Sequence, residues 1–292
     1  MSIVVPAHNE ARVIGRLLAG LTGPDAPAGL DILVVANGCS DETAAVAAAY
    51  GPSVRVLETP KPSKYNAMRL ADAATDVFPR IYVDADVEFT AADARALAAH
   101  LSEDGPILAA APERRMPTAG LSWTIRWYYD VWPKLPAVRA GLFGRGVIGV
   151  SAKGFARLSA LPELMGDDLA ASLSFSADER LIAADSFATV HPPRTCGDLV
   201  RRRVRAVTVT VQAGRREELA QAGAESRTTK ADLLAVLRSS PVALAPKVAW
   251  FLAVTLYARR RADKAVKAGD FTTWLRDESS RAAAEPAGPP GA

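Results

Sequence analysis

The feature that most constrains the fold is a regular alternation of short apolar runs and amphipathic segments along residues 2–114. The apolar runs have the character of strands, and they lie at 2–6, 31–37, 54–58, 80–86 and 105–114. The segments between them have helical periodicity; residues 9–21, for example, place Val13, Ile14, Leu17, Leu18 and Leu21 on one side. Strands and helices that alternate in this way build βα units and a mostly parallel sheet. The sequence therefore predicts an α/β fold with a Rossmann-like central sheet flanked by helices.

The composition agrees with a soluble globular protein. Of 292 residues, 49% are hydrophobic and 23% are charged, and the net charge of +3 is too small to indicate nucleic acid as a partner. The two cysteines have neither metal-ligand nor disulfide spacing, which favours a reducing cytoplasm. The chain opens directly on a strand-like run, so we expect no signal peptide, and no apolar stretch is long enough to predict a spanning helix.

Polar clusters follow three of the expected strands, at 6–10, 37–41 and 84–86. Because ligands of such sheets bind outside the carboxyl ends of the strands, the three clusters are expected to converge on one crevice.

Asp84 and Asp86 are the most informative of these residues. Two carboxylates one residue apart at a strand end can both reach one hard divalent cation, and Mn²⁺ and Mg²⁺ prefer such oxygen ligands. An ion held there could neutralise a diphosphate. The alternative is a pair of solvated loop acids.

The other two clusters allow both a structural and a functional interpretation. Asn9 and Glu10 stand where a helix begins, so they could present free N–H groups to an anion or a base, or Asn9 could simply cap the helix. Asn37 belongs to an Asn-Gly turn, and Asp41 is either the next helix cap or a contact to base or ribose.

The motifs VVPAHNE, VVANGCSDET, KPSKYNA, YVDADVEF, GDD and RRVR follow one another in this order. As an ordered set they resemble a family 2 glycosyltransferase of the GT-A fold, over about residues 2–210. The resemblance implies a nucleotide-diphosphate sugar as donor. It implies that the nucleoside is held by Pro6, Ala7, Asn9, Glu10, Asn37 and Asp41.

The resemblance also assigns the residues around the diphosphate. Lys61, favoured over Lys64 by spacing, matches a lysine near the nucleotide. Asp86 matches the metal ligand of the DxD motif, and Asp84 lies nearer to ribose and phosphate while also serving the metal. Mn²⁺ or Mg²⁺ is the implied cofactor.

On the acceptor side, GDD resembles the Glu-Asp motif, with Asp168 as the implied catalytic base and Asp167 beside it. Two adjacent acids repel, which can lift one pKa toward the working range. Both acids could instead cap the following helix.

Arg205, in the RRVR element, would clamp the departing diphosphate. A solvated basic helix face is the alternative. The glutamine and tryptophan of processive relatives are replaced by Arg202 and Ala206, which argues against long-chain polymerisation.

Two further segments are predicted to serve the acceptor, a carbohydrate or a lipid-linked molecule. GRGVIGVSAKG resembles the family's glycine-rich acceptor loop, in which Gly146 and Gly149 allow close approach of a sugar. The segment 122–135 carries three of the five tryptophans. Trp123 there belongs either to an acceptor platform or to a helix packed on the core.

Residues 1–210 are expected to form the catalytic domain, 211–281 a C-terminal helical extension and 282–292 a disordered tail. Within the extension, 241–261 combines apolar residues with three arginines. It could dock on the catalytic domain or lie on the inner face of the plasma membrane.

The sequence thus predicts an inverting, metal-dependent transfer of one sugar in cell-envelope biosynthesis. Two alternatives stay open: a sugar nucleotidyltransferase, and a non-catalytic nucleotide-sugar-binding or membrane-recruited protein.

Overall fold

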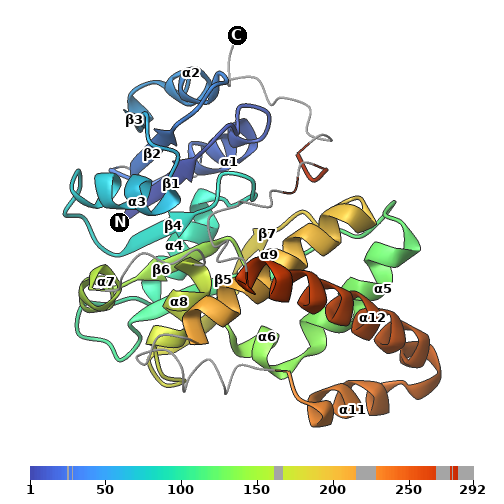
Figure 1. Cartoon of the computed structure of the whole chain (residues 1–292). Helices are drawn as coiled ribbons and strands as arrows, with labels where there is room; N and C mark the ends of the chain where they lie inside the picture. Colours follow the sequence, from blue (N-terminus) through green and yellow to red (C-terminus); the bar gives the residue numbers. More distant parts are fainter. Residues whose placement is uncertain are drawn as a thin grey trace.

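A seven-stranded mixed sheet forms the centre of the protein in a computed structural model, which describes residues 1–24, 26–27, 29–160, 167–214, 228–267, 277 and 279–281 (Figure 1). The strands are β1 (Ser2–Ala7), β2 (Asp31–Asn37), β3 (Val54–Thr59), β4 (Arg80–Val83), β5 (Ala109–Arg115), β6 (Val147–Val150) and β7 (Arg180–Thr189). Their order is β3-β2-β1-β4-β6-β5-β7. Only β6 runs antiparallel to its neighbours, β4 and β5. The predicted α/β architecture is confirmed.

The apolar runs form strands that are buried on both faces. Successive side chains of a strand point to opposite faces of the sheet. Ile3 and Val5 of β1 accordingly pack in one cluster with α1, whereas Val4 packs in another with α3. A strand covered on both sides needs apolar residues at every position. This requirement explains the absence of a polar alternation in β1 and β2.

Helices cover both faces of the sheet. α1 (Ile14–Leu21), α2 (Thr43–Ala48) and α4 (Ala91–Ala99) share a cluster on one face. α3 (Lys64–Asp72) covers β1 and β2 on the other face, and α7 (Ala152–Ser159) and α8 (Asp167–Ser174) pack with β5 and β6. The short 3-10 helix η1 (Gly51–Ser53) precedes β3. Thr90 caps α4 as expected, since its side chain accepts a hydrogen bond from the Asp93 N–H.

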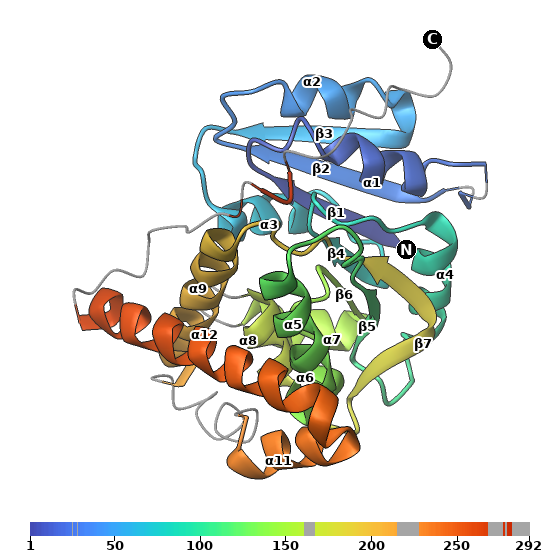
Figure 2. The same cartoon turned by 90° about the vertical axis from the view of Figure 1, so that its right-hand side faces the viewer.

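A second layer of helices lies beside the sheet (Figure 2). It comprises α5 (Trp123–Val131), η2 (Trp132–Lys134), α6 (Pro136–Ala140), α9 (Cys196–Gly214), α11 (Lys230–Ser239) and α12 (Pro241–Lys267). Side chains from α5, α6, α9, α11 and α12 form one apolar cluster. The domain boundary expected after residue 210 falls inside the continuous helix α9. The expected tail, 282–292, lies outside the described residues.

α12 docks on the protein along one side only. Its buried residues, among them Val248, Phe251 and Val254, pack toward α5 and α9. By length and composition the segment Pro241–Lys264 is apolar enough to cross a bilayer, which the sequence reasoning did not predict, and 22% of its most apolar window is buried. A spanning helix is weakly supported by composition alone, whereas the packing shows a helix docked through one face.

Candidate active site

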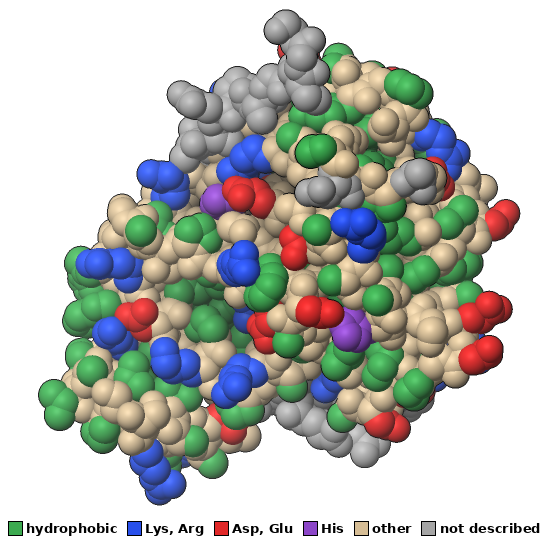
Figure 3. Space-filling model, turned by 180° about the vertical axis from the view of Figure 1, so that it is seen from behind, with side chains coloured by type: hydrophobic (Ala, Val, Ile, Leu, Met, Phe, Trp, Pro, Cys, Tyr) green, Lys and Arg blue, Asp and Glu red, His purple; other side chains and the backbone are tan. Residues whose placement is uncertain are grey.

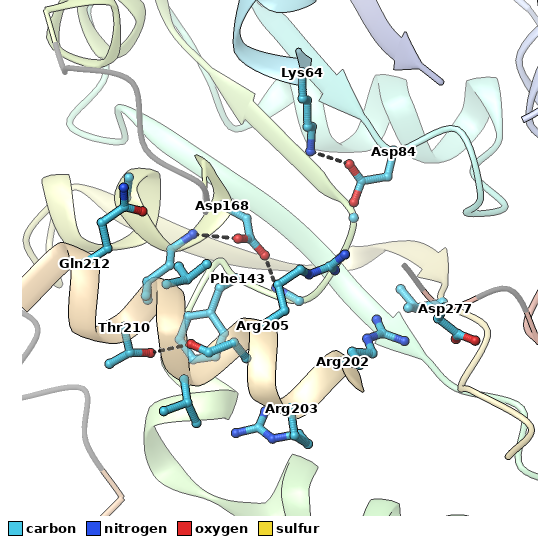
Figure 4. A pocket seen from close by; sticks show the side chains of 18 of the residues that line it. Lys64, Asp84, Phe143, Asp168, Arg202, Arg203, Arg205, Thr210, Gln212 and Asp277 are labelled. Carbon is cyan, nitrogen blue, oxygen red and sulfur yellow. Dashed lines mark hydrogen bonds and ion pairs between the residues drawn. The ribbon is translucent and has the colours of Figure 1, made fainter. Parts of the chain in front are cut away.

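A cavity of about 1800 Å³ opens at the carboxyl edge of the sheet and extends toward the second layer of helices (Figure 4). Much of its polar lining comes from six regions: the ends of β1, β2 and β4, the starts of α3 and α8, and one side of α9. These residues include His8, Glu10, Asn37, Lys64, Asp84, Asp86, Asp168, Arg202 and Arg205. The three clusters expected to converge do contribute to one cavity.

The loops after β1 and β2 are tied to each other. Asn37 Nδ2 donates to the Ala7 carbonyl at 2.7 Å, and His8 Nδ1 donates to the Asn37 carbonyl at 2.6 Å. Asn9 has a positive φ of 53° and accepts the Ser40 N–H on Oδ1 at 2.8 Å. These bonds hold the two strand ends in register at the edge of the cavity.

Asp84 follows β4 directly and faces a lysine. Lys64 Nζ lies 2.6 Å from Asp84 Oδ1, while the Asp84 N–H donates to the Gly146 carbonyl at 2.7 Å. Gly146 has a φ of +67°, and a Cβ added there would lie 2.4 Å from Val87 Cγ1. Gly146 therefore allows the glycine-rich loop to pass close to the carboxylate.

Asp86 meets an arginine from the far end of the chain. Arg281 Nη2 lies 2.8 Å from Asp86 Oδ2. The same guanidinium donates to both carboxylate oxygens of Glu10 at 2.8 Å. Burial alone would raise the pKa of Asp86, but Arg281 and the arginines of α9 hold that pKa below its usual value.

Asp168 lies on the opposite side of the cavity at the start of α8. Its Oδ2 accepts the Gly144 N–H and its Oδ1 accepts the Leu169 N–H, each at 2.8 Å. Two backbone donors thus hold the carboxylate in a fixed orientation. The side chain of Asp167 lies outside the described residues.

The arginines of α9 lie between these two acidic sides. Figure 4 shows Arg205 reaching toward the space between Asp84 and Asp168, and Arg202 near Asp277. Burial and the neighbouring Arg202 lower the pKa of the Arg205 guanidinium, while the two acids oppose this effect. The cavity therefore contains a half-buried cationic centre flanked by carboxylates, an arrangement that suits a diphosphate.

Several predicted site residues do not line the cavity. Lys64, not Lys61, reaches Asp84. Gly149 lies within β6, where an added Cβ would meet Leu101 and Leu97 in the core. The glycine-rich motif and the order of the motifs along the chain do not show whether Lys61 and Gly149 face the cavity.

Trp123 is also misplaced as an acceptor residue. It is 50% exposed and contacts Trp127 and Trp250, with ring centroids 4.9 and 5.3 Å apart. The helix-packing interpretation of segment 122–135 is therefore the better one, since Ile125 and Tyr128 are fully buried.

Ala7, Asn9 and Asp41 are also not among the residues that line the cavity. Ala7 is fully buried in the core, and Asp41 accepts the Ala11 N–H at 3.1 Å and the Thr43 N–H at 3.1 Å. These contacts give Asp41 a bracing role between the first two loops.

Two arginines of the site were missed by the sequence reasoning. Arg281 lies in a segment without periodicity. Arg114, the second-last residue of β5, donates to the Gly144 carbonyl at 3.0 Å, and its guanidinium lies over the Trp132 ring at 4.4 Å. Burial, with Arg145 close by, lowers the pKa of Arg114 to about 9. Through its hydrogen bond to the Gly144 carbonyl, Arg114 fixes the loop whose Gly144 N–H donates to Asp168. No sequence motif marks Arg114 as a site residue.

The fold and the cavity define a class of protein: an open α/β sheet with paired carboxylates and arginines at its carboxyl edge. A family model described as glycosyl transferase family 2 matches residues 2–157, more than half of the chain. The chain belongs to this family, which confirms the resemblance inferred from its motifs.

Sequence relatives agree with this assignment. An uncharacterized glycosyltransferase of Mycobacterium tuberculosis is 33% identical over 123 residues, covering 42% of this chain and 52% of the relative. The 4,4'-diaponeurosporenoate glycosyltransferase of Staphylococcus aureus is 34% identical over 100 residues, covering 32% of this chain and 26% of the relative. The matched part thus spans about half or less of these curated relatives.

Solved structures share the fold. A mannosyltransferase from Pyrobaculum calidifontis, in complex with GDP-Man and Mn²⁺, superposes with a TM-score of 0.59 at 18% identity, covering 94% of this chain and 75% of that one. Glucosyl-3-phosphoglycerate synthase from Mycobacterium tuberculosis, with Mn²⁺, UDP and phosphoglyceric acid, gives 0.54 at 18% identity, covering 72% and 77%. Both have the GT-A glycosyltransferase fold.

Proposed function

We propose that the protein transfers one sugar from a nucleoside-diphosphate sugar to an acceptor hydroxyl with inversion. The observation that carries this proposal is the arrangement of one cavity: Asp84 and Asp86 on one side, Asp168 on the other and Arg205 between them. Membership of the family and the nucleotide-bound structures of similar fold support it.

Mn²⁺ or Mg²⁺ fits the donor side of this cavity. Asp84 and Asp86 offer hard oxygen ligands, and their side chains are 42% and 31% exposed toward it. Among the described residues no group of three or more His, Cys, Asp or Glu side chains could hold a metal. Diphosphate oxygens and water would therefore complete the coordination. When bound, the ion would neutralise charge on the leaving diphosphate.

The reaction follows from the placement of the chain's own groups. Asp168 would remove the proton of the acceptor hydroxyl, since a sugar hydroxyl is a poor nucleophile at neutral pH. The acceptor oxygen would form a bond to the anomeric carbon as the bond to the diphosphate oxygen breaks, with inversion at that carbon. Arg202 and Arg205 would stabilise the leaving diphosphate through charge-assisted hydrogen bonds. The proton ends on Asp168 and the electron pair on the diphosphate.

The far end of the cavity supports a lipid-linked acceptor. Away from Asp84 the lining runs along α9, α11 and α12, where apolar residues lie among polar ones such as Thr210, Gln212 and Lys230. These apolar residues include Val207, Val211, Leu233, Leu252 and Leu256. An apolar chain attached to the acceptor could occupy this end while its reacting hydroxyl lies near Asp168.

The outer side of α12 supports contact with the cytoplasmic face of a membrane. Val242 and Tyr257 are 93% and 53% exposed, and the exposed residues Arg260 and Arg261 follow them, whereas Arg259 lines the cavity. Seen from behind, hydrophobic and Lys/Arg side chains lie interspersed over the region of α11 and α12 (Figure 3). Such a surface suits the interface of an anionic bilayer.

The decisive experiment measures release of nucleoside diphosphate from a panel of nucleotide sugars with Mn²⁺ and extracted acceptor lipids. We expect turnover with at least one donor and none for Asp86→Ala. Asp168→Asn should lower kcat about 10²- to 10⁴-fold, as loss of a general base does, and leave donor affinity nearly unchanged.

Asp185→Asn is the matched control, because Asp185 is an exposed carboxylate of β7 that contacts His100 rather than the cavity. Its activity should equal that of the wild type. No turnover across the full panel, or full activity of Asp86→Ala, would refute the proposed reaction.

A further inference from the structure

The last described residues of the chain return to the donor side of the cavity and place one guanidinium on two acids. Arg281 Nε and Nη2 each lie 2.8 Å from an oxygen of Glu10, and Nη2 also lies 2.8 Å from Asp86 Oδ2. The Arg281 side chain is 16% exposed and that of Glu10 is 10% exposed. This is a charge-assisted, bidentate ion pair that is largely removed from solvent.

The backbone around Arg281 is itself anchored, so the contact does not depend on one side chain alone. Ser279 Oγ accepts the N–H of Arg194, just before α9, at 2.9 Å. Asp277 Oδ1 accepts the N–H of Ser279 at 3.0 Å and that of Ser280 at 3.3 Å, which closes a turn. The guanidinium also donates to the Asp277 carbonyl. The turn therefore presents Arg281 to the acids in a defined geometry.

The two acids are those to which the proposed function gives the donor and the metal. A divalent ion on Asp86 would place two positive charges against the guanidinium that already contacts the same oxygen. At such short range and with little solvent access, this repulsion is only weakly screened. Both oxygens of Glu10 accept hydrogen bonds from Arg281, which leaves Glu10 less acceptor capacity for a nucleoside.

We propose that Arg281 is a further donor-site residue that acts as an internal counter-ion: it occupies Glu10 and Asp86 and must be displaced when the metal and the nucleotide bind. This inference rests on the proposed function. Arg281 thereby lowers the affinity of the site for its divalent ion. The C-terminal turn, remote in sequence from the catalytic motifs, thus sets the concentration of metal and donor at which the enzyme operates.

The test measures binding of Mn²⁺ directly, with and without inorganic pyrophosphate, from the electron paramagnetic resonance signal of unbound Mn²⁺ in the full-length protein. Arg281→Gln removes the charge and keeps a similar length. It should lower the Kd for Mn²⁺ roughly tenfold, the effect of losing one charge-assisted pair. Arg281→Lys keeps the positive charge but cannot form the bidentate pair of hydrogen bonds. The Kd for Mn²⁺ should therefore fall less in Arg281→Lys than in Arg281→Gln.

Arg55→Gln is the control, since Arg55 makes an equally bidentate pair with Asp31, at 2.9 Å for both bonds, at the opposite end of β2. Its Kd for Mn²⁺ should not change. A Kd in Arg281→Gln that is unchanged or higher would overturn the counter-ion role, because Arg281 would then be neutral toward the ion or help to bind it.

Asp86→Ala separates this inference from the proposed function. If Asp86→Ala loses Mn²⁺ binding while Arg281→Gln does not tighten it, the metal site stands and the counter-ion role fails. If Asp86→Ala binds Mn²⁺ like the wild type, the proposed metal site itself fails. Far-UV circular dichroism of each variant verifies that it is folded.

Discussion

Gly146 shows how one residue holds the catalytic loop against Asp84. Its φ of +67° favours glycine, and an added Cβ would lie 2.4 Å from Val87 Cγ1. Gly120 has a similar φ of +74° with nothing within 4 Å of an added Cβ. Alanine substitutions at Gly146 and Gly120 therefore separate two destabilising effects of an added Cβ. One is the left-handed backbone that both residues share, and the other is the collision with Val87, which occurs only at Gly146.

We expect Gly120→Ala to lower the free energy of unfolding by about 1 kcal/mol, through the left-handed backbone alone. Gly146→Ala should cost about 1–3 kcal/mol more, because the collision with Val87 overpacks the site. Urea denaturation of both variants measures the difference. Equal losses in the two variants would show that the loop moves away from Val87 freely.

Single residues were predicted well where their function follows from the end of a strand. Asp84, Asp86 and Glu10 lie in the cavity because parallel strands bring their carboxyl ends to one edge. Gly149 and Lys61 do not line the cavity, because motif order gives the position of a residue along the chain but not the direction in which it faces. Arg281 could not be foreseen, since only tertiary contacts bring its segment to β4.

At the scale of elements, α12 has one side packed on the protein and one side exposed. Its inner side packs on α5 and α9, and Trp250 Nε1 donates to the Thr124 carbonyl at 2.8 Å. Its outer side carries exposed apolar residues and the arginines that follow them. Apolar residues followed by three arginines indicated a docked or membrane-interfacial segment but not which of the two would apply. The two sides of α12 are compatible with both.

Membrane contact is testable on the outer side. Replacing Arg260 and Arg261 by Gln should weaken binding to vesicles that contain phosphatidylserine by about 1 kcal/mol per arginine, or roughly thirtyfold together. Binding to neutral vesicles should not change, because the substitutions remove only the electrostatic attraction between the arginines and anionic lipid headgroups. Co-sedimentation with vesicles of both compositions measures the effect.

The matched control replaces Arg55 and Arg95 by Gln, which removes the same charge from exposed residues of β3 and α4. These variants should bind anionic vesicles like the wild type. Equal weakening in both double variants would mean that net charge, not the α12 surface, drives association.

At the scale of the whole molecule, the sheet and the second layer of helices meet at the cavity. The sequence predicted the βα half because each unit there forms from neighbouring segments. The chain was divided at residue 210 because the resemblance to the family extends about that far, whereas α9 continues to Gly214 and packs with both α5 and α12. Long-range packing of this kind leaves no local pattern, so only the three-dimensional structure shows that the proposed extension shares a core with the earlier helices.

The shared core predicts that the two layers unfold together. Four of the five tryptophans, Trp123, Trp127, Trp132 and Trp250, lie in α5, η2 and α12, and the fifth, Trp274, lies outside the described residues. Tryptophan fluorescence therefore reports mainly on the second layer, whereas far-UV circular dichroism reports on all helices and strands.

Tyr128 of α5 stacks on Phe251 of α12 with ring centroids 5.0 Å apart, so the extension cannot unfold without exposing the catalytic half. We expect the two signals to give coincident urea transitions, because a single cooperative unit shows no intermediate. A fluorescence transition at lower urea concentration, with most of the dichroism retained, would show instead that residues 211–281 form a separate unit.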